Sequence, residues 1–426
     1  MSIRFDRHVQ HVRMATHGAI FNIFLLTSCT DVYFYDDLFT TESAAIGMFY
    51  EHEGMVPCRA SLCSVMLGSP QGTFCYRSRR TMLPLSRIAF LACLSMTLLT
   101  SKAFSEELLM YEPAPDLPGN GRRVVLVAGD EEYRSEEALP MLGKLLARRH
   151  GFHCTVLFSL NEEGVIDPDA RGNIPGLQAL DNADFMVLFT RFRRLPDEDM
   201  KHLVDYVESG RPMLAIRTAT HAFAYERDSE SPYAHWSWDN RDTWLGGFGR
   251  EILGETWVNH HGGHGSQSTR GVVPDAVRKH PLVRGVEDVW GPTDVYGIRD
   301  LPEDAVVLLE GSVQEGMTPE APAVDGPQNA PRMPIVWLRN RPLDNGKVQR
   351  IVTSTLGASV DLNSEDLRRL FVNTAYWGVG LEEQIPDRSD ASLVGDYEPT
   401  MFGFGSFVQG LRPEDHRLPE PDNSRH

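Results

Sequence analysis

Strands and helices alternate along this chain from Arg122 onward, and this alternation restricts the fold more than any other feature of the sequence. The run "RRVVLVAG" (122–129) is short, apolar and rich in β-branched residues, as buried parallel strands are. A helix is expected from a Ser135 cap to about His150, with acidic residues in its first turn. Three more strands follow in "FHCTVLFSL", "ADFMVLFT" and "RPMLAIRTA", with the helix "PDEDMKHLVDYVESG" before the last. This spacing is typical of βαβ units, so we predict an α/β fold with a mostly parallel sheet flanked by helices.

The second half of the chain is richer in strand patterns than in helices. Strands are expected in "ETWVNHH", "TRGVV", "DVYGI", "AVVLLEGSV", "PIVWLRN" and "QRIVTSTLG", followed by the helix "SEDLRRLFVNTAYWGVG". A tail, 387–426, contains the aromatic and glycine-rich stretch "GDYEPTMFGFGSFVQG". We therefore expect a β-rich addition to the parallel sheet, and a tail that wraps the domain.

The first hundred residues differ from the rest of the chain. Residues 1–81 show neither helical nor strand periodicity, whereas 82–105 resemble a secretory signal peptide with an apolar run and the small-x-small site Ala103-Phe104-Ser105. We predict that translation starts at Met82, that 1–81 are a mis-assigned extension, and that 106–121 are a linker. Five of the six cysteines precede residue 106, so Cys154 alone remains, without a disulfide framework. The expected location is the periplasm or the cell exterior.

Charge restricts the partners of the protein. The formal net charge is −18, with 59 acidic against 41 basic residues. Nucleic acids and anionic membranes require a basic face, so neither is an expected partner. A carbohydrate or another small polar ligand is expected instead, and a homo-oligomer is left open.

Several stretches of the mature chain resemble one protein family. They are "GDEEYRSEEALPMLGKLLARRHGF", "LVDYVESGRPMLAIRTATHAF", "WVNHHGGHG" and "QRIVTSTLGASVDLNSEDLRRLFVNTAYWGVGLEEQIP". In this order, residues 122–386 resemble the ThuA-like (trehalose utilisation) family, and the tail "MFGFGSFVQGLRPEDH" resembles that of secreted planctomycete-type members. The resemblance implies a flavodoxin-like, class I glutamine-amidotransferase-like fold and a role in sugar metabolism.

The strand ends carry candidate site residues, because ligands of open α/β sheets bind beyond the carboxyl ends of the strands. Where amidotransferases of this fold present a cysteine nucleophile, this chain has Arg217, which cannot act as one. Glutamine amidotransferase chemistry is therefore excluded. Arg217 is a candidate clamp for the substrate or a structural ion-pair partner of Asp130 or Glu131. His221 is a candidate acid/base or a helix cap, and Asp130 and Glu131 are candidate catalytic carboxylates or helix-dipole partners.

The stretch "WVNHHGGHG" (257–265) places His260, His261 and His264 within five residues. If "ETWVN" is a strand, His260 and His261 point to opposite faces, so at most one of them joins His264 at a ligand. Three roles are open: acid/base or sugar-binding residues, a structural loop, or zinc ligands whose third partner the sequence does not identify. We expect no cofactor and no metal.

Aromatic and acidic residues complete the candidate site. The stretch "AYERDSESPYAHWSWDNRDTWLGG" suits either sugar stacking or a lid with its own small core. Related proteins often carry Gly-His where this chain has Ala358-Ser359, so Asp361 is the polar candidate that is left there. The candidate substrate-binding residues besides Arg217 are Tyr133, Trp236, Trp257, Asp294, Tyr296 and Asp361. The main hypothesis is acid/base chemistry by His221 and one of His260, His261 or His264 on a sugar or an oxidised sugar; the alternatives are a non-catalytic glycan-binding module and a partner-binding protein.

Overall fold

The computed structural model describes residues 108–419 with their side chains and, before them, only the backbone of six short strands. These strands are β1 (Val9–Thr16), β2 (Ala19–Leu26), β3 (Tyr33–Tyr35), β4 (Ile46–Met48), β5 (Val65–Ser69) and β6 (Gly72–Cys75), in two three-stranded antiparallel sheets. The expected signal peptide, 82–105, lies outside the described residues. No helix in the described part of the chain has the length and apolar character needed to cross a membrane.

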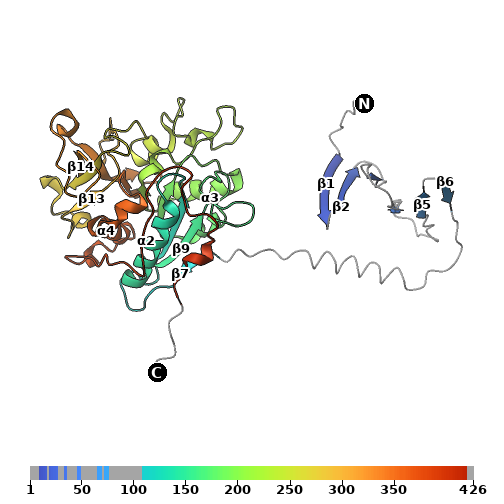
Figure 1. Cartoon of the computed structure of the whole chain (residues 1–426), viewed down its shortest axis with the longest axis horizontal. Helices are drawn as coiled ribbons and strands as arrows, with labels where there is room; N and C mark the ends of the chain where they lie inside the picture. The colour runs from blue at the N-terminus through green and yellow to red at the C-terminus, as the bar shows by residue number, and fades with distance from the viewer. Residues whose placement is uncertain are drawn as a thin grey trace, which may run out of the picture. The chain divides into compact units, whose positions relative to one another are not determined.

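Residues 108–419 are built on one ten-stranded sheet (Figure 1), whose strand order is β13-β12-β14-β15-β16-β11-β10-β8-β9-β7. The first five of its strands in the chain are β7 (Leu109–Tyr111), β8 (Arg123–Gly129), β9 (His153–Phe158), β10 (Phe185–Thr190) and β11 (Met213–Ile216). The others are β12 (Ser268–Val272), β13 (Val289–Gly291), β14 (Ala305–Gln314), β15 (Met333–Pro342) and β16 (Val348–Ser354). The short strand β7 lies within the segment expected to be a linker.

The sheet is mixed, which corrects the expectation of a mostly parallel one. The adjacent strands β9, β8, β10, β11 and β16 run parallel, as the βαβ pattern predicts. On either side the pairing is antiparallel: β7 joins β9 at one edge, and β15, β14, β12 and β13 continue from β16 at the other. The short connection 343–347 joins β15 to β16, and strands joined by such a short turn pair antiparallel. The α/β class and the β-rich second half agree with the sequence prediction.

Three α-helices pack on the parallel part of the sheet. They are α2 (Ser135–His150), α3 (Asp197–Glu208) and α4 (Glu365–Gly378). Side chains from α2 and α4 share one apolar core with alternate residues of β8 and β10, such as Val124 and Val187. The intervening residues, such as Val125 and Met186, form a second core with α3. The strands are thus buried on both faces, which explains their continuous apolar runs.

Two local predictions were wrong. Ser135 does not cap α2: the N-cap is Arg134, which is left-handed at φ 62°, and the Ser135 hydroxyl accepts a hydrogen bond from the Asp130 amide instead. "ETWVN" and "DVYGI" are irregular segments that meet in a single antiparallel bridge between His260 and Tyr296. Both segments serve the candidate site instead of extending the sheet.

Candidate functional site

Polar side chains from four separate segments converge beyond the carboxyl ends of β8 and β11. The segment after β8 contributes Glu132 and Tyr133, the turn after β11 contributes Arg217, and two loops contribute the rest. We call the group the strand-end cluster; it consists of Glu132, Tyr133, Arg217, His260, His264, Asp294 and Tyr296. The structure therefore brings together residues that lie up to 164 positions apart in the sequence.

Arg217 occupies a strained turn at the centre of the cluster. Its backbone is left-handed, at φ 44°, directly after β11, and the short helix Arg217–His221 follows. The chain thus makes a sharp strand-to-helix turn that begins with an arginine. The side chain is fully buried, and its guanidinium lies between the rings of Tyr133 and Tyr296, 4.3 and 4.2 Å from their centroids. A buried arginine held on both faces by rings positions its neighbours and does not reach solvent.

Asp294 connects Arg217 to two histidines. Its Oδ1 accepts a hydrogen bond from Arg217 Nη2 (3.0 Å) and lies 3.2 Å from His264 Nδ1, while its Oδ2 lies 2.7 Å from His260 Nδ1. Burial alone would raise the pKa of Asp294, but the hydrogen bonds from both histidines and the charge of Arg217 hold that pKa well below its usual range. Asp294 is therefore a permanent anion that fixes the orientation of the histidine rings.

The two histidines differ in their surroundings. Both side chains are 36% exposed, and the ring centroids lie 4.7 Å apart. The Nε2 atom of His260 has no hydrogen-bond partner within residues 108–419, whereas His264 Nε2 lies 3.4 Å from Glu132. The hydrogen bond to Asp294 raises the pKa of His264, and Glu132 adds to this effect. One ring thus presents an open nitrogen, and its neighbour favours the protonated state.

His261 and His221 have other contact partners than His260 and His264. His261 turns away, and its Nε2 contacts the backbone oxygen of Gln328 at 2.8 Å. His221 is buried against the rings of Trp257 and Tyr296, at 5.8 and 6.3 Å. Burial and then the charge of Arg191 lower the pKa of His221 well below its usual value, so the ring is neutral. Neither His261 nor His221 forms a hydrogen bond with Asp294, unlike His260 and His264.

Donor atoms at this site are close enough to hold a cation. One ligand atom each from His260, His264 and Asp294 lie within 4.8 Å of one another. Two imidazoles and one carboxylate form a donor set that zinc and similar divalent ions accept. The same atoms also satisfy one another as hydrogen-bond partners, and that arrangement needs no ion.

Asp130 and Glu131 serve as internal clamps in the structure. Asp130 accepts hydrogen bonds from the amides of Glu132 and Tyr133 and from the hydroxyl of Thr218, which fixes the turn after β8 against the turn after β11. Glu131 is buried among three arginines, Arg171 (3.2 Å), Arg191 (2.7 Å) and Arg193 (2.9 Å). Neither carboxylate faces the histidines, and Arg217 pairs with Asp294 instead of with either of them.

Of the remaining predicted site residues, Trp257 borders the strand-end cluster, whereas Trp236 and Asp361 are buried outside it. Trp257 lies 5.7 Å from His260, ring to ring, and so borders the cluster. Trp236 is buried and stacks on Phe248, in agreement with the lid or small-core interpretation of that stretch. Asp361 is buried and accepts hydrogen bonds from the amides of Thr293, Gly357 and Ala358 and from the Thr293 hydroxyl. It holds two loops together behind the cluster.

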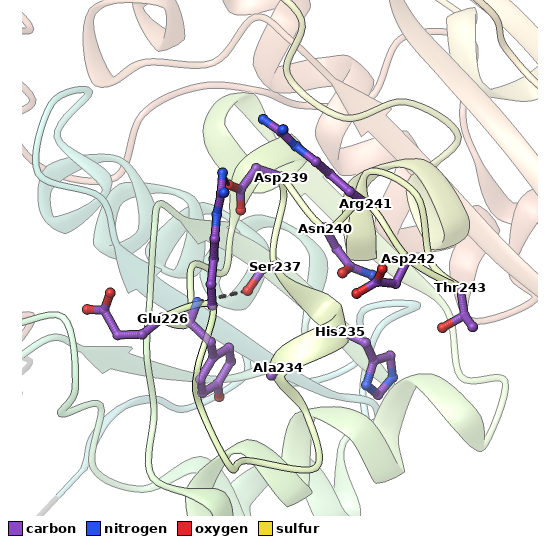
Figure 2. A pocket seen from close by; sticks show the side chains of 11 residues that line it. Glu226, Ala234, His235, Ser237, Asp239, Asn240, Arg241, Asp242 and Thr243 are labelled. Atoms are coloured by element: carbon purple, nitrogen blue, oxygen red, sulfur yellow. Dashed lines mark hydrogen bonds and ion pairs between the residues drawn. The ribbon is translucent and has the colours of Figure 1, made fainter.

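A separate pocket of about 370 Å³ lies in the loop region between β11 and the histidines (Figure 2). Most of the residues that line it carry polar or charged side chains, and Arg227 pairs with Asp239 there at 3.9 Å. The lining residues are Tyr225, Glu226, Arg227, Ala234, His235, Ser237, Asp239, Asn240, Arg241, Asp242 and Thr243. All of them lie in the stretch 224–247, whose sequence suits sugar stacking or a lid, but none belongs to the strand-end cluster, so the pocket and the cluster are different places.

Several residues at the cluster were not predicted as site residues. Glu132 follows the predicted Asp130 and Glu131 directly, and Arg191 comes directly after the expected strand "ADFMVLFT". Arg191 lies 3.5 Å from Glu132 and links it to the Glu131 clamp. Phe402, from the tail, lies 5.4 Å from His264 and 5.5 Å from Tyr133, ring to ring. The position of Arg191 after a buried strand was a usable signal, whereas Phe402 had none.

Comparisons with known proteins give structural neighbours at low similarity. No protein-family model and no curated protein matches the chain. A crystal structure described as that of a ThuA-like protein from Parabacteroides merdae is similar over 70% of this chain and 99% of the other, at 15% identity and a TM-score of 0.36. The mmIFT52 N-terminal domain is similar over 60% of this chain and 96% of its own, at 12% identity and a TM-score of 0.31.

Proposed function

We propose that this chain is a secreted or periplasmic protein of ThuA-like type that acts on a carbohydrate or an oxidised sugar at the strand-end cluster. The ordered motifs between residues 122 and 386 support the ThuA-like type, and the signal-like segment 82–105 supports secretion. The net charge of −18 argues for a small polar ligand over nucleic acid.

The contact between His260 and Asp294 carries the proposal. The carboxylate accepts the Nδ1–H proton, which fixes the tautomer and leaves the lone pair of Nε2 facing outward. A partly exposed imidazole in this state is a general base for a hydroxyl, or for a carbon next to the carbonyl of an oxidised sugar. His264, with its raised pKa, supplies a neighbouring positive charge that stabilises the oxyanion formed when the proton leaves.

The experiment follows turnover of a sugar panel by proton NMR, with the full chain and the variant His260→Ala. The panel comprises trehalose, glucosides and oxidised derivatives of both that carry a ring carbonyl group. Loss of the base is expected to reduce turnover by about 10²- to 10⁴-fold. His202→Ala is the matched control, because His202 Nδ1 also lies 2.7 Å from a carboxylate, that of Asp181, but on α3. Turnover that survives in His260→Ala contradicts the proposal, and binding without turnover in the native chain favours the glycan-binding module.

A further inference from the structure

The tail returns to the strand-end cluster and packs against it. The Phe402 ring contacts the rings of Tyr133 and His264, and the Gly403 amide donates a hydrogen bond to the backbone oxygen of Glu132 at 2.8 Å. Residues 400–406 are therefore part of the wall of the cluster, although they follow β11 by more than 180 positions.

The buried side chain of Arg134 fixes the position of residues 400–406. Arg134 donates hydrogen bonds to Gly403 O (2.7 Å), to Thr400 Oγ1 (3.2 Å) and to the Ser406 hydroxyl. Glu137 accepts hydrogen bonds from the Thr400 amide and hydroxyl, at 2.8 and 2.6 Å. Burial of a guanidinium is costly unless its donors are satisfied, so the path of the tail is specified and not incidental.

This anchored segment holds two large apolar side chains out toward solvent, Met401 and Phe404, and only Phe404 is aromatic. Phe404 is 62% exposed, the highest value among the exposed large hydrophobic residues of the described chain. Gly403 (φ 144°) and Gly405 (φ 65°) flank it in conformations that favour glycine, and they present its ring outward. The Arg191 guanidinium lies 5.0 Å from the ring centroid.

The position of Phe404 connects it to the proposed base. Arg191 lies 3.5 Å from Glu132, Glu132 lies 3.4 Å from His264, and the His264 ring adjoins that of His260. The apolar ring of Phe404 is therefore followed by the guanidinium of Arg191, the carboxylate of Glu132 and the imidazole of His264. Hydroxyl-rich rings with an apolar C–H face require this combination, since the aromatic ring covers the C–H face and the polar groups bond the hydroxyls.

We propose that residues 400–406 form one wall of the sugar site, and that Phe404 is a stacking platform for a pyranose ring. The proposal rests on the proposed function, because it assigns the ligand of the same site. It predicts that pyranoses with an uncovered C–H face bind better than open-chain polyols of similar polarity.

The test measures the affinity of the full chain for methyl α-D-glucopyranoside, trehalose and D-sorbitol by isothermal titration, in the native protein and in Phe404→Ala. Affinity for the better pyranose is expected to fall about 3- to 10-fold in Phe404→Ala and to recover in Phe404→Trp. Val408→Ala is the matched control: Val408 is an exposed apolar residue of the same tail, but it lies outside residues 400–406. The control is expected to bind like the native chain.

The outcomes separate the two proposals. Unchanged affinity in Phe404→Ala, or sorbitol binding equal to that of the pyranoses, overturns the platform and leaves the role of His260 standing. Weaker binding in Phe404→Ala with full turnover in His260→Ala overturns the proposed chemistry and keeps the platform. Failure of both pyranoses to bind the native chain at about 10 mM overturns the platform, and the turnover assay with oxidised sugars then decides the proposed chemistry separately. A lower oligomeric mass of Phe404→Ala in light scattering, without a change in affinity, shows that a second copy covers the ring and also overturns the platform.

Discussion

Replacing Asp294 by asparagine tests the electrostatic arrangement of the cluster most sharply. The variant keeps the shape of the side chain but removes a charge that is only 1% exposed. Arg217, which is fully buried, then has no counterion among its hydrogen-bond partners, which are otherwise backbone oxygens of Thr355 and Asp294. Removing one partner of a buried ion pair costs about 3–5 kcal/mol, because the other charge stays buried. We expect Asp294→Asn to lower the free energy of unfolding by this amount at pH 7.

The assay is urea unfolding followed by tryptophan fluorescence, which reports only on the domain, because all seven tryptophans follow residue 235. Asp184→Asn is the control: Asp184 pairs with Arg122 at 3.8 Å, and both side chains are more than a third exposed. Exposed pairs contribute about 0–1 kcal/mol, so this control is expected to unfold much like the native chain.

The pH dependence adds a second criterion. The pKa of Asp294 is depressed in the folded state, so its contribution is complete above the unfolded value of about 3.9 and is lost as the pH falls below it. The stability difference between the native chain and Asp294→Asn should therefore shrink from pH 5 toward pH 3. A difference below about 1 kcal/mol at pH 7, or one that does not change with pH over this range, would refute the reasoning.

Three further predictions concern neighbouring groups. Glu131→Gln leaves the fully buried Arg193 without its carboxylate and should cost about 3 kcal/mol in urea unfolding; a loss like that of Asp184→Asn would contradict the clamp. Burial raises the pKa of Glu136 to about 8, so native stability should fall as the pH rises from about 4.5 to 8, and Glu136→Gln should remove this slope and stabilise the chain by about 1–3 kcal/mol at pH 7. Burial lowers the pKa of His221, so the native chain should lose stability as the pH falls below about 6.5, and an equal loss in His221→Gln would exclude this residue as the cause.

The parallel part of the fold could be predicted from the sequence, because its signal is local. β8, β9, β10 and β11 are short, mainly apolar runs, and α2 and α4 lie where the sequence pattern predicts helices. Burial on both faces requires such runs, so each strand is recognisable without knowledge of its neighbours.

The rest of the fold depends on contacts that the local pattern does not encode. "ETWVN" and "DVYGI" have strand-like composition, yet they meet only in one bridge and bend to bring His260 to Asp294. The helix cap at Arg134 was missed for a similar reason: its left-handed backbone is held by hydrogen bonds to tail residues more than 260 positions away. Tertiary contacts overrode local preference at these places.

The candidate site was partly accessible from the sequence, through the rule that ligands bind beyond the ends of parallel strands. That rule identified Tyr133 and Arg217, and the histidine motif identified His260 and His264. It did not separate Asp130 and Glu131, which clamp the turns, from Glu132, which faces His264. Consecutive residues in an irregular turn point in directions that only the folded backbone determines.

A crystal structure of the full chain with the pyranose that binds most tightly tests the central claim most directly. Our account predicts that a hydroxyl or an acidic C–H of the sugar lies next to His260 Nε2, and that its C–H face lies on the ring of Phe404. A sugar bound instead in the polar pocket that contains His235 and Asp242 (Figure 2), with the strand-end cluster left without ligand, would contradict the account.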